Sequence, residues 1–226
     1  MTRYVDISGW IDNGMWQSAS NYPGATITEV PQPPEMKDEP PVFNQQFLLS
    51  GQSGTYIETK AHADPAATPV SACAIEDFVM NCVVLRVASK RQNEPIEMGE
   101  LEKLHVDVPP DSAVLLATDW DRHWHTPEQF IAGSPYITAD AAQWIFDKKP
   151  RLLGADIPRF DYPPQRVFPW QAFWDRVRYL MAPVTNIHQD SFTHGRLFCF
   201  PLKIRGAMGT PVRAVLEISP FIMEGR

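Results

Sequence analysis

The sequence predicts a mixed α/β fold in a single domain that spans residues 1–226. Short apolar runs of strand length alternate along the chain with segments whose apolar residues recur at helical spacing. No internal repeat or linker divides these segments. The length of 226 residues and the hydrophobic content of 44% are sufficient for one substantial core.

The strands are predicted from β-forming residues and continuous apolar runs. Met1–Ser50 is rich in β-formers and turn residues, which indicates irregular strands and loops. Within it, Pro31–Pro41 (PQPPEMKDEPP) predicts an extended proline-rich connector, with part of a lid as the alternative. Buried strands are predicted further along, at Cys82–Ala88, Ala113–Thr118, Leu152–Asp156, Leu197–Ile204 and Val212–Ile218.

Three helices are predicted between these strands. Thr126 stands before Pro127, which is the order of a cap residue and a proline at the first helical position. Thr138 can cap a second helix, whose apolar face contains Ala141, Trp144 and Ile145. A third helical pattern follows Pro169 and comprises Trp170, Phe173, Trp174, Val177 and Met181.

Composition excludes several classes of function. The net charge is −7 and the pI is near 5.3, so we expect neither a nucleic-acid partner nor an anionic membrane partner. No signal peptide or membrane span is predicted, and the three scattered cysteines predict reduced thiols in a cytoplasmic protein. The sequence also lacks the phosphate-loop, dinucleotide-binding, serine-hydrolase and HExxH zinc-protease motifs.

Four stretches carry a resemblance to a known family. The first is VDISGWIDNGMWQSASNYPG near the N-terminus, and the second is QSGTYIETKAHA at Gln52–Ala63. The third runs from Leu115 to Pro158 and contains a tryptophan-aspartate loop, SPYI and GADIP. The fourth is PLKIRGAMGTPVRAVLEI at Pro201–Ile218. In this order, they resemble the cyclase family of metal-dependent hydrolases, which includes kynurenine formamidase-like and isatin hydrolase-like enzymes.

The resemblance implies a swivelling β/β/α-type fold with a mixed sheet and flanking helices, assembled as a homodimer or homotetramer. Such enzymes use zinc or manganese to open an amide, lactam, formamide or lactone, because the ion lowers the pKa of its bound water. In the family's signature, H-x-G-T-H-x-D-x-P-x-H-F, two His and the Asp hold one metal, and the last His assists proton transfer. The Asp also bridges to a second metal, held by a His on a late helix and a Glu twelve residues further on.

This chain departs from that pattern at every ligand position. Gln52, Tyr56 and Glu58 stand at the three signature ligands, whereas His62 retains the last histidine. Alignment of the late helix places Arg176 and His188 at the remaining pair, which keeps the spacing (188 − 176 = 12). Amide, phenol and guanidinium groups are poor ligands for zinc, so we do not expect an intact two-metal site.

The substituted residues are expected to meet in one pocket, where Arg176 would pair with Glu58. Buried without partners, such groups would cost about 1–3 kcal/mol each, so a mutually satisfied network is predicted. The expected catalytic residues are Tyr56, Glu58, His62 and His188, and the expected substrate-binding residues are Gln52, Trp120, Trp124 and Arg176. A single zinc or manganese ion on Glu58, His62 and His188 stays open as an alternative, although the charge of Arg176 opposes it.

Two functions remain open at this point. The first is a hydrolase or lyase-like enzyme that acts on a small cyclic or aromatic amide, lactam, formamide or lactone through a metal-poor acid–base site. The second is a catalytically silent member of the family that binds a small polar ligand or has a structural role.

Overall fold

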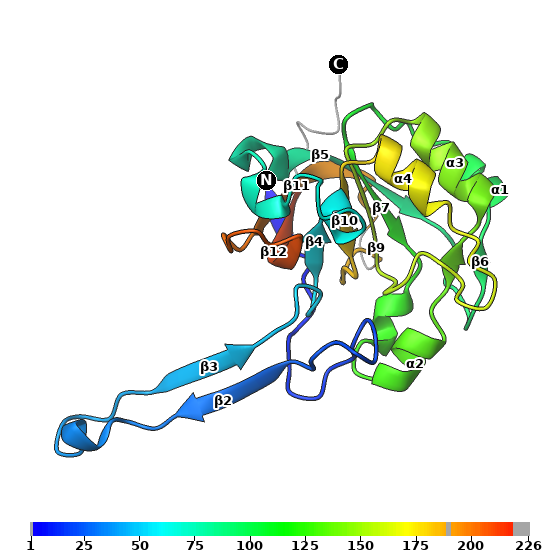
Figure 1. Ribbon diagram of the computed structural model, residues 1–226. Helices are drawn as coiled ribbons and strands as arrows, with labels where there is room; N and C mark the ends of the chain where they lie inside the picture. Colours follow the sequence, from blue (N-terminus) through cyan, green and yellow to red (C-terminus); the bar gives the residue numbers. More distant parts are fainter. Residues whose placement is uncertain (1, 189–190, 219–226) are drawn as a thin grey trace.

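The computed structural model describes residues 2–188 and 191–218, and its main body is built on one large sheet (Figure 1). The strands of this sheet follow the order β1-β12-β11-β5-β7-β9-β10-β4, and β4 also pairs with β12. The sheet therefore closes on itself through β12 and β4, with β1 added at the outside of β12. The strands are β1 (Arg3–Asp6), β4 (Tyr56–Glu58), β5 (Val79–Arg86), β7 (Ala113–Ala117), β9 (Leu152–Ala155), β10 (Tyr179–Ala182), β11 (His194–Pro201) and β12 (Gly209–Ile218).

Parallel strands form the centre of this sheet. β5, β7, β9 and β10 are parallel neighbours, and every residue of β7 and β9 is buried. Continuous apolar runs suit such strands because both of their faces are covered. The five strands predicted from apolar runs are confirmed, although β11 begins three residues before the predicted Leu197 and ends at Pro201.

Short helices cover one face of the sheet. They are α1 (Met98–Glu102), α2 (Pro127–Ala132), α3 (Ala139–Asp147) and α4 (Trp170–Arg176). The 3-10 turns η2 (Lys60–His62), η3 (Val70–Ala72) and η4 (Ile75–Phe78) lie between β4 and β5, and η5 (Trp120–His123) follows β7. In Figure 1, α1, α3 and α4 lie together beside β7. A small two-stranded sheet, β6 (Pro95–Ile96) with β8 (Tyr136–Ile137), adjoins them. The predicted mixed α/β fold is confirmed.

Two apolar clusters occupy the two faces of the sheet. Alternate residues of β5 separate them, since Val83 and Leu85 pack with the helices whereas Cys82 and Val84 pack with the other cluster. The first cluster contains the buried faces of α3 and α4, including Ile145 and Phe173. Its edge near α4 forms one wall of the cavity described below.

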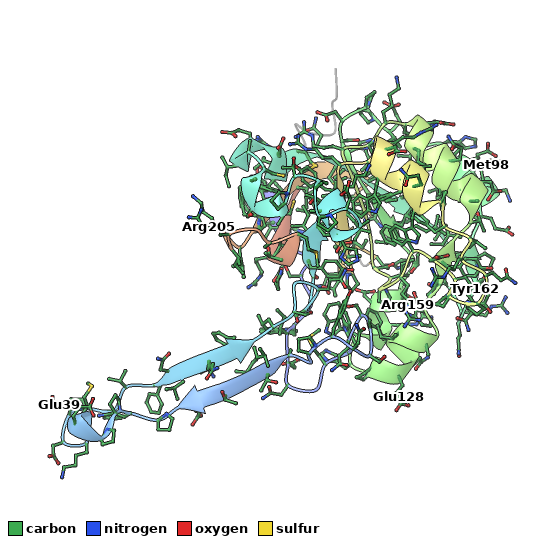
Figure 2. The ribbon with its side chains drawn as sticks, viewed as in Figure 1. Glu39, Met98, Glu128, Arg159, Tyr162 and Arg205 are labelled. Carbon is green, nitrogen blue, oxygen red and sulfur yellow. The ribbon has the colours of Figure 1, made fainter. Side chains whose placement is uncertain are left out.

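A long hairpin projects from the body, as Figure 1 shows. It consists of β2 (Thr26–Val30) and β3 (Asn44–Leu48), and its far end holds the 3-10 turn η1 (Pro34–Met36). The proline-rich segment Pro31–Pro41 is therefore a connector between two strands, as the sequence predicts. Figure 2 shows Glu39 at this far end, away from the body.

Some local predictions are wrong. The helix after Pro169 ends at Arg176, and Met181 belongs to β10 because the chain turns directly into a strand. Thr126 makes no side-chain cap bond, although Pro127 occupies the first turn of α2 as predicted. Thr138 does cap α3, where its hydroxyl accepts a bond from the Ala141 amide. Among residues 2–188 and 191–218, no helix is long and apolar enough to cross a membrane.

Candidate functional site

A cavity of about 600 Å³ opens between β4, the end of β10, the start of α4 and the loop after β9. This volume lies within the range of small-molecule sites. Four of the site residues expected from the sequence line it, namely Gln52, Tyr56, Glu58 and His62. Its other walls include Ser18, Tyr22, Arg159, Phe160, Asp161, Trp170, Gln171, Trp174, Leu180 and Ala182.

The short strand β4 aims two polar side chains into the cavity. Tyr56 and Glu58 are two positions apart, so they share one face, while Ile57 between them packs into the apolar cluster on the opposite face. Glu58 is paired across the ladder with Leu180, and Tyr56 with Ala182. The turn before β4 requires Gly54, whose φ is +66° and whose Cα has no room for a Cβ beside Ile11.

Glu58 is the most buried charged group of the cavity, with a relative exposure of 2%. Its carboxylate accepts a bond from Gln52 Nε2 at 2.8 Å, and the other end of the same amide accepts a bond from Ser18 Oγ at 2.8 Å. Burial raises the pKa of Glu58, against the lowering effects of His62 and of the Gln52 bond. Gln52, and not the Arg176 expected from the sequence, is therefore the hydrogen-bond partner of Glu58.

His62 faces the same carboxylate from the turn η2. Thr59 caps this turn by accepting a bond from the Ala61 amide, which directs His62 back toward Glu58. His62 Nδ1 lies 3.7 Å from Glu58 Oε2, which is within ion-pair distance but longer than a hydrogen bond. The side chain of His62 is 32% exposed, so the rest of the imidazole is accessible from solvent.

Tyr56 contributes a neutral phenol to the cavity. Burial and the neighbouring Glu58 raise the pKa of Tyr56 well above its ordinary value, so the O–H stays protonated at any physiological pH. Within the part of the chain that the structure describes, this hydroxyl has no hydrogen-bond partner. It is therefore a donor available to a bound molecule.

Aromatic rings form the mouth and one side of the cavity. Trp170 and Trp174 stack at a centroid distance of 6.5 Å, and Phe160 lies nearly parallel to Trp170 at 6.3 Å. Trp170 Nε1 donates to Asp161 Oδ2 at 3.3 Å, which fixes the orientation of the indole ring. Flat apolar walls of this kind suit a planar ring.

His188 lies elsewhere, in a second cavity of about 760 Å³. Its Nδ1 is 3.9 Å from Asp119 Oδ1, and Asp121 also lines this cavity. The prediction that His188 shares a pocket with Glu58 and His62 is wrong. A single metal ion on Glu58, His62 and His188 is therefore not supported by their positions.

Arg176, Trp120 and Trp124 do not line the first cavity either. Arg176 ends α4 on an exposed turn and pairs with Asp147 at 3.3 Å, so the predicted Arg176–Glu58 pair is wrong. Trp120 is 1% exposed and donates to the Phe130 carbonyl, which places it in the core. Trp124 lines the second cavity, with its Nε1 bonded to the Trp10 carbonyl.

The structure suggests a different pair for the last two family positions. Trp170 and Ala182 both line the first cavity, and they keep the same spacing (182 − 170 = 12). Ala182 is the ladder partner of Tyr56, so it stands next to the signature segment. The sequence does not point to this pair, because neither an indole nor a methyl group is a metal ligand.

The residues at this cavity do not fit a pair of metal ions. Glu58 is the one carboxylate from the signature segment, and its Oε2 already receives the Gln52 N–H. Neither Trp170 nor Ala182 offers a donor atom of the kind zinc or manganese binds. No group of three or more His, Cys, Asp and Glu side chains that could hold a metal occurs among the described residues.

Comparison with known proteins identifies relatives over nearly the whole chain. A family model described as "Putative cyclase" matches residues 5–162. The chain is 25% identical over 218 residues to a kynurenine formamidase of Bacillus cereus, covering 96% of this chain and 98% of that protein. A kynurenine formamidase of Bacillus anthracis is 26% identical over the same length and the same shares. These enzymes are hydrolases that act on amide C–N bonds.

Solved structures show the same fold. An isatin hydrolase bound to the product analogue thioisatinate has a TM-score of 0.81 at 20% identity, covering 96% of this chain and 92% of that one. A potential metal-dependent hydrolase with cyclase activity has a TM-score of 0.75 at 17% identity, covering 97% and 100%. At these identities the comparison supports the fold.

Proposed function

Because this chain belongs to the cyclase family, we propose that it hydrolyses a small cyclic or aromatic amide, lactam, formamide or lactone at the first cavity. The observation that carries the proposal is the pair formed by Glu58 and His62, a buried carboxylate that faces a solvent-accessible imidazole. The pair stands where the family's signature has its bridging Asp and last His. Acid–base chemistry needs a group of this kind within reach of a bound carbonyl.

His62 is the general base in this proposal. Its Nδ1 faces Glu58, which favours the tautomer with the proton on Nδ1 and leaves Nε2 free to accept one. His62 takes a proton from water as the water oxygen attacks the substrate carbonyl carbon. The same proton is then given to the leaving nitrogen or oxygen as its bond to that carbon breaks. The Glu58 carboxylate stabilises the imidazolium between the two steps.

Tyr56 and Gln52 have supporting parts. The Tyr56 hydroxyl is neutral and has no partner within residues 2–188 and 191–218, so it can donate to the oxygen that gains charge in the transition state. Gln52 holds Glu58 through its Nε2, while Ser18 holds Gln52. The proposed site is metal-poor, because donor groups at the family's ligand positions are replaced or already bonded.

The test is hydrolysis of a panel of probes by the purified protein, followed by absorbance: isatin, formanilide, 2-oxindole and dihydrocoumarin. We expect at least one probe to be hydrolysed by the wild type, and Tyr56→Phe to lower kcat by about tenfold or more with little change in KM. His125→Ala, an exposed histidine outside the first cavity, is the matched control and should retain full activity. Binding of the probes without hydrolysis of any would favour the catalytically silent alternative.

We also propose that the chain forms a homodimer or homotetramer through the β2–β3 hairpin. Phe43 is 88% exposed and Phe47 is 60% exposed, which is a large apolar surface for an arm with two strands. The far end is acidic, because Glu35, Asp38 and Glu39 outnumber the one base, Lys37. The turn between β11 and β12 is basic through Lys203 and Arg205, and Figure 2 shows Arg205 on it. The same turn exposes Leu202 and Ile204. In charge and in apolar surface it therefore complements the arm of a second copy.

Sedimentation velocity tests this assembly. The wild type should sediment as a dimer or tetramer, and the double variant Phe43→Ser/Phe47→Ser should shift toward the monomer. A monomeric wild type would contradict the proposal. A cytoplasmic location, which the free thiols of Cys73, Cys82 and Cys199 support, remains part of the proposal.

A further inference from the structure

Two arginines line the first cavity, the partly buried Arg159 and the exposed Arg166, and the proposed chemistry uses neither charge. The guanidinium of Arg159 makes no hydrogen bond or ion pair with any residue of the described ranges 2–188 and 191–218. The carbonyl of Arg159, by contrast, accepts a bond from Ser134 Oγ at 3.5 Å.

The two carboxylates that line the cavity, Glu58 and Asp161, already have hydrogen-bond partners. Asp161 Oδ1 accepts bonds from the amides of Tyr162 and Phe168, and its Oδ2 accepts from Trp170 Nε1. Glu58 receives the Gln52 amide and faces His62. A partly buried guanidinium among acids with other partners is arranged to take an anion from outside.

The backbone around Arg159 is held firmly. Pro158 before it is buried and lies three residues after the end of β9 (158 − 155 = 3). Phe160 after it is 2% exposed, and its carbonyl accepts a bond from the Ile137 amide at 2.9 Å. The side chain therefore starts from a fixed point, which lowers the entropy lost when it binds a ligand. Figure 2 shows Arg159 in the part of the body that also carries Tyr162.

We propose that Arg159 binds a carboxylate of the substrate, so that the substrate class is an aromatic ring bearing both a carboxylate and the bond to be cleaved. The inference rests on the proposed hydrolysis at Glu58 and His62. Guanidinium binds a carboxylate through two parallel N–H donors, while Trp170 and Trp174 provide flat walls for the ring. Glu58 and His62 line the same cavity, where the scissile carbonyl would lie.

The test compares a charged and a neutral probe of the same shape. Benzoate and benzamide are titrated by calorimetry into the wild type, Arg159→Gln, Arg159→Lys and the control Arg122→Gln, whose arginine lines the second cavity. We expect the wild type to bind benzoate at least about tenfold more tightly than benzamide, and Arg159→Gln to lose that preference. Arg159→Lys should keep part of it, because the charge remains without the paired donors.

Equal binding of benzoate by the wild type and Arg159→Gln would overturn the inference, as would equal binding of the two probes by the wild type. A drop with Arg122→Gln of the same size would also overturn it. If Arg159→Gln does not fold, Arg159→Lys decides by itself. A loss of about threefold or more in the preference for benzoate supports the inference, and an unchanged preference overturns it. If no probe is hydrolysed but benzoate binding depends on Arg159, the proposed reaction is rejected and the carboxylate-binding role of Arg159 is kept.

Discussion

The first and the second cavity each bring histidine and carboxylate side chains together, yet the carboxylates have different roles in the two. In the second cavity, Asp119 binds Arg122 and Ser89, and Asp121 accepts the Asn186 amide at 2.7 Å. These carboxylates hold loops in place. In the first cavity, Glu58 is held by one amide and faces His62 beside aromatic walls. A carboxylate near a histidine therefore indicates a site only where loop structure does not already use the carboxylate.

The largest expected effect separates the two histidines. His62→Ala should lower kcat/KM for any hydrolysed probe by about 100-fold or more, because general-base catalysis contributes at least that much. His188→Ala, the matched change in the second cavity, should leave kcat/KM within about twofold of the wild type. Similar losses in both variants, measured by initial rates at equal concentrations of folded protein, would remove the distinction between the cavities.

The next effect is on stability and concerns Asp156, whose fully buried carboxylate accepts bonds from Thr118 N, Thr118 Oγ1 and Asp119 N. Asp156→Ala should lower the free energy of unfolding by about 2 kcal/mol or more, because these donors lose their partner. Burial raises the pKa of Asp156 to about 7. Urea unfolding followed by circular dichroism measures the loss.

The pH dependence of this loss has a definite sign. Between the ordinary pKa of an aspartate, about 4, and the folded value, the folded protein binds more protons than the unfolded chain, so wild-type stability falls as pH rises through this window. Asp156→Ala removes that contribution, and its penalty should be larger near pH 5 than near pH 8. A penalty that grows toward pH 8 would contradict the account.

A smaller effect is expected from Gln52→Leu, which removes the N–H donor to Glu58. The pKa of Glu58 should rise further, because this bond stabilises the charged form. The acid limb of the kcat/KM profile should therefore move to higher pH. Ser18→Ala, which leaves the Gln52–Glu58 bond intact, should move the limb less. An unshifted limb in Gln52→Leu would show that Glu58 does not control the profile.

The smallest effect is expected at Arg176. Because its pair with Asp147 is exposed, Arg176→Ala should change the free energy of unfolding by less than about 1 kcal/mol and leave kcat/KM unchanged. A tenfold loss of activity would instead restore the site predicted from the sequence, in which Arg176 faces Glu58.

The sequence predicts the fold well where the signal is local. Ala113–Ala117 is an uninterrupted apolar run, and both faces of that strand are buried. Gln52, Tyr56, Glu58 and His62 were also found together, because they lie within one segment that folds as a turn, a short strand and a turn.

The remainder of the site depends on contacts distant in sequence. Arg176 and His188 are twelve residues apart, as are Trp170 and Ala182, so both pairs fit the family spacing. The polar side chains of the first pair made it the expected one. The choice between the two pairs depends on where α4 ends and β10 begins, and a sequence pattern defines helix boundaries poorly. Arg159 follows the predicted strand Leu152–Asp156, but only the folded chain shows that its charge lacks a partner among the described residues.

The central claim is hydrolysis by Glu58 and His62 without a metal pair. The most direct measurement is the metal content of the purified protein by mass spectrometry, with the rate of probe hydrolysis before and after dialysis against a chelator. The account predicts less than about 0.1 zinc or manganese ion per chain and a rate within about twofold of the starting value. A rate that disappears on chelation and returns with zinc or manganese would contradict it.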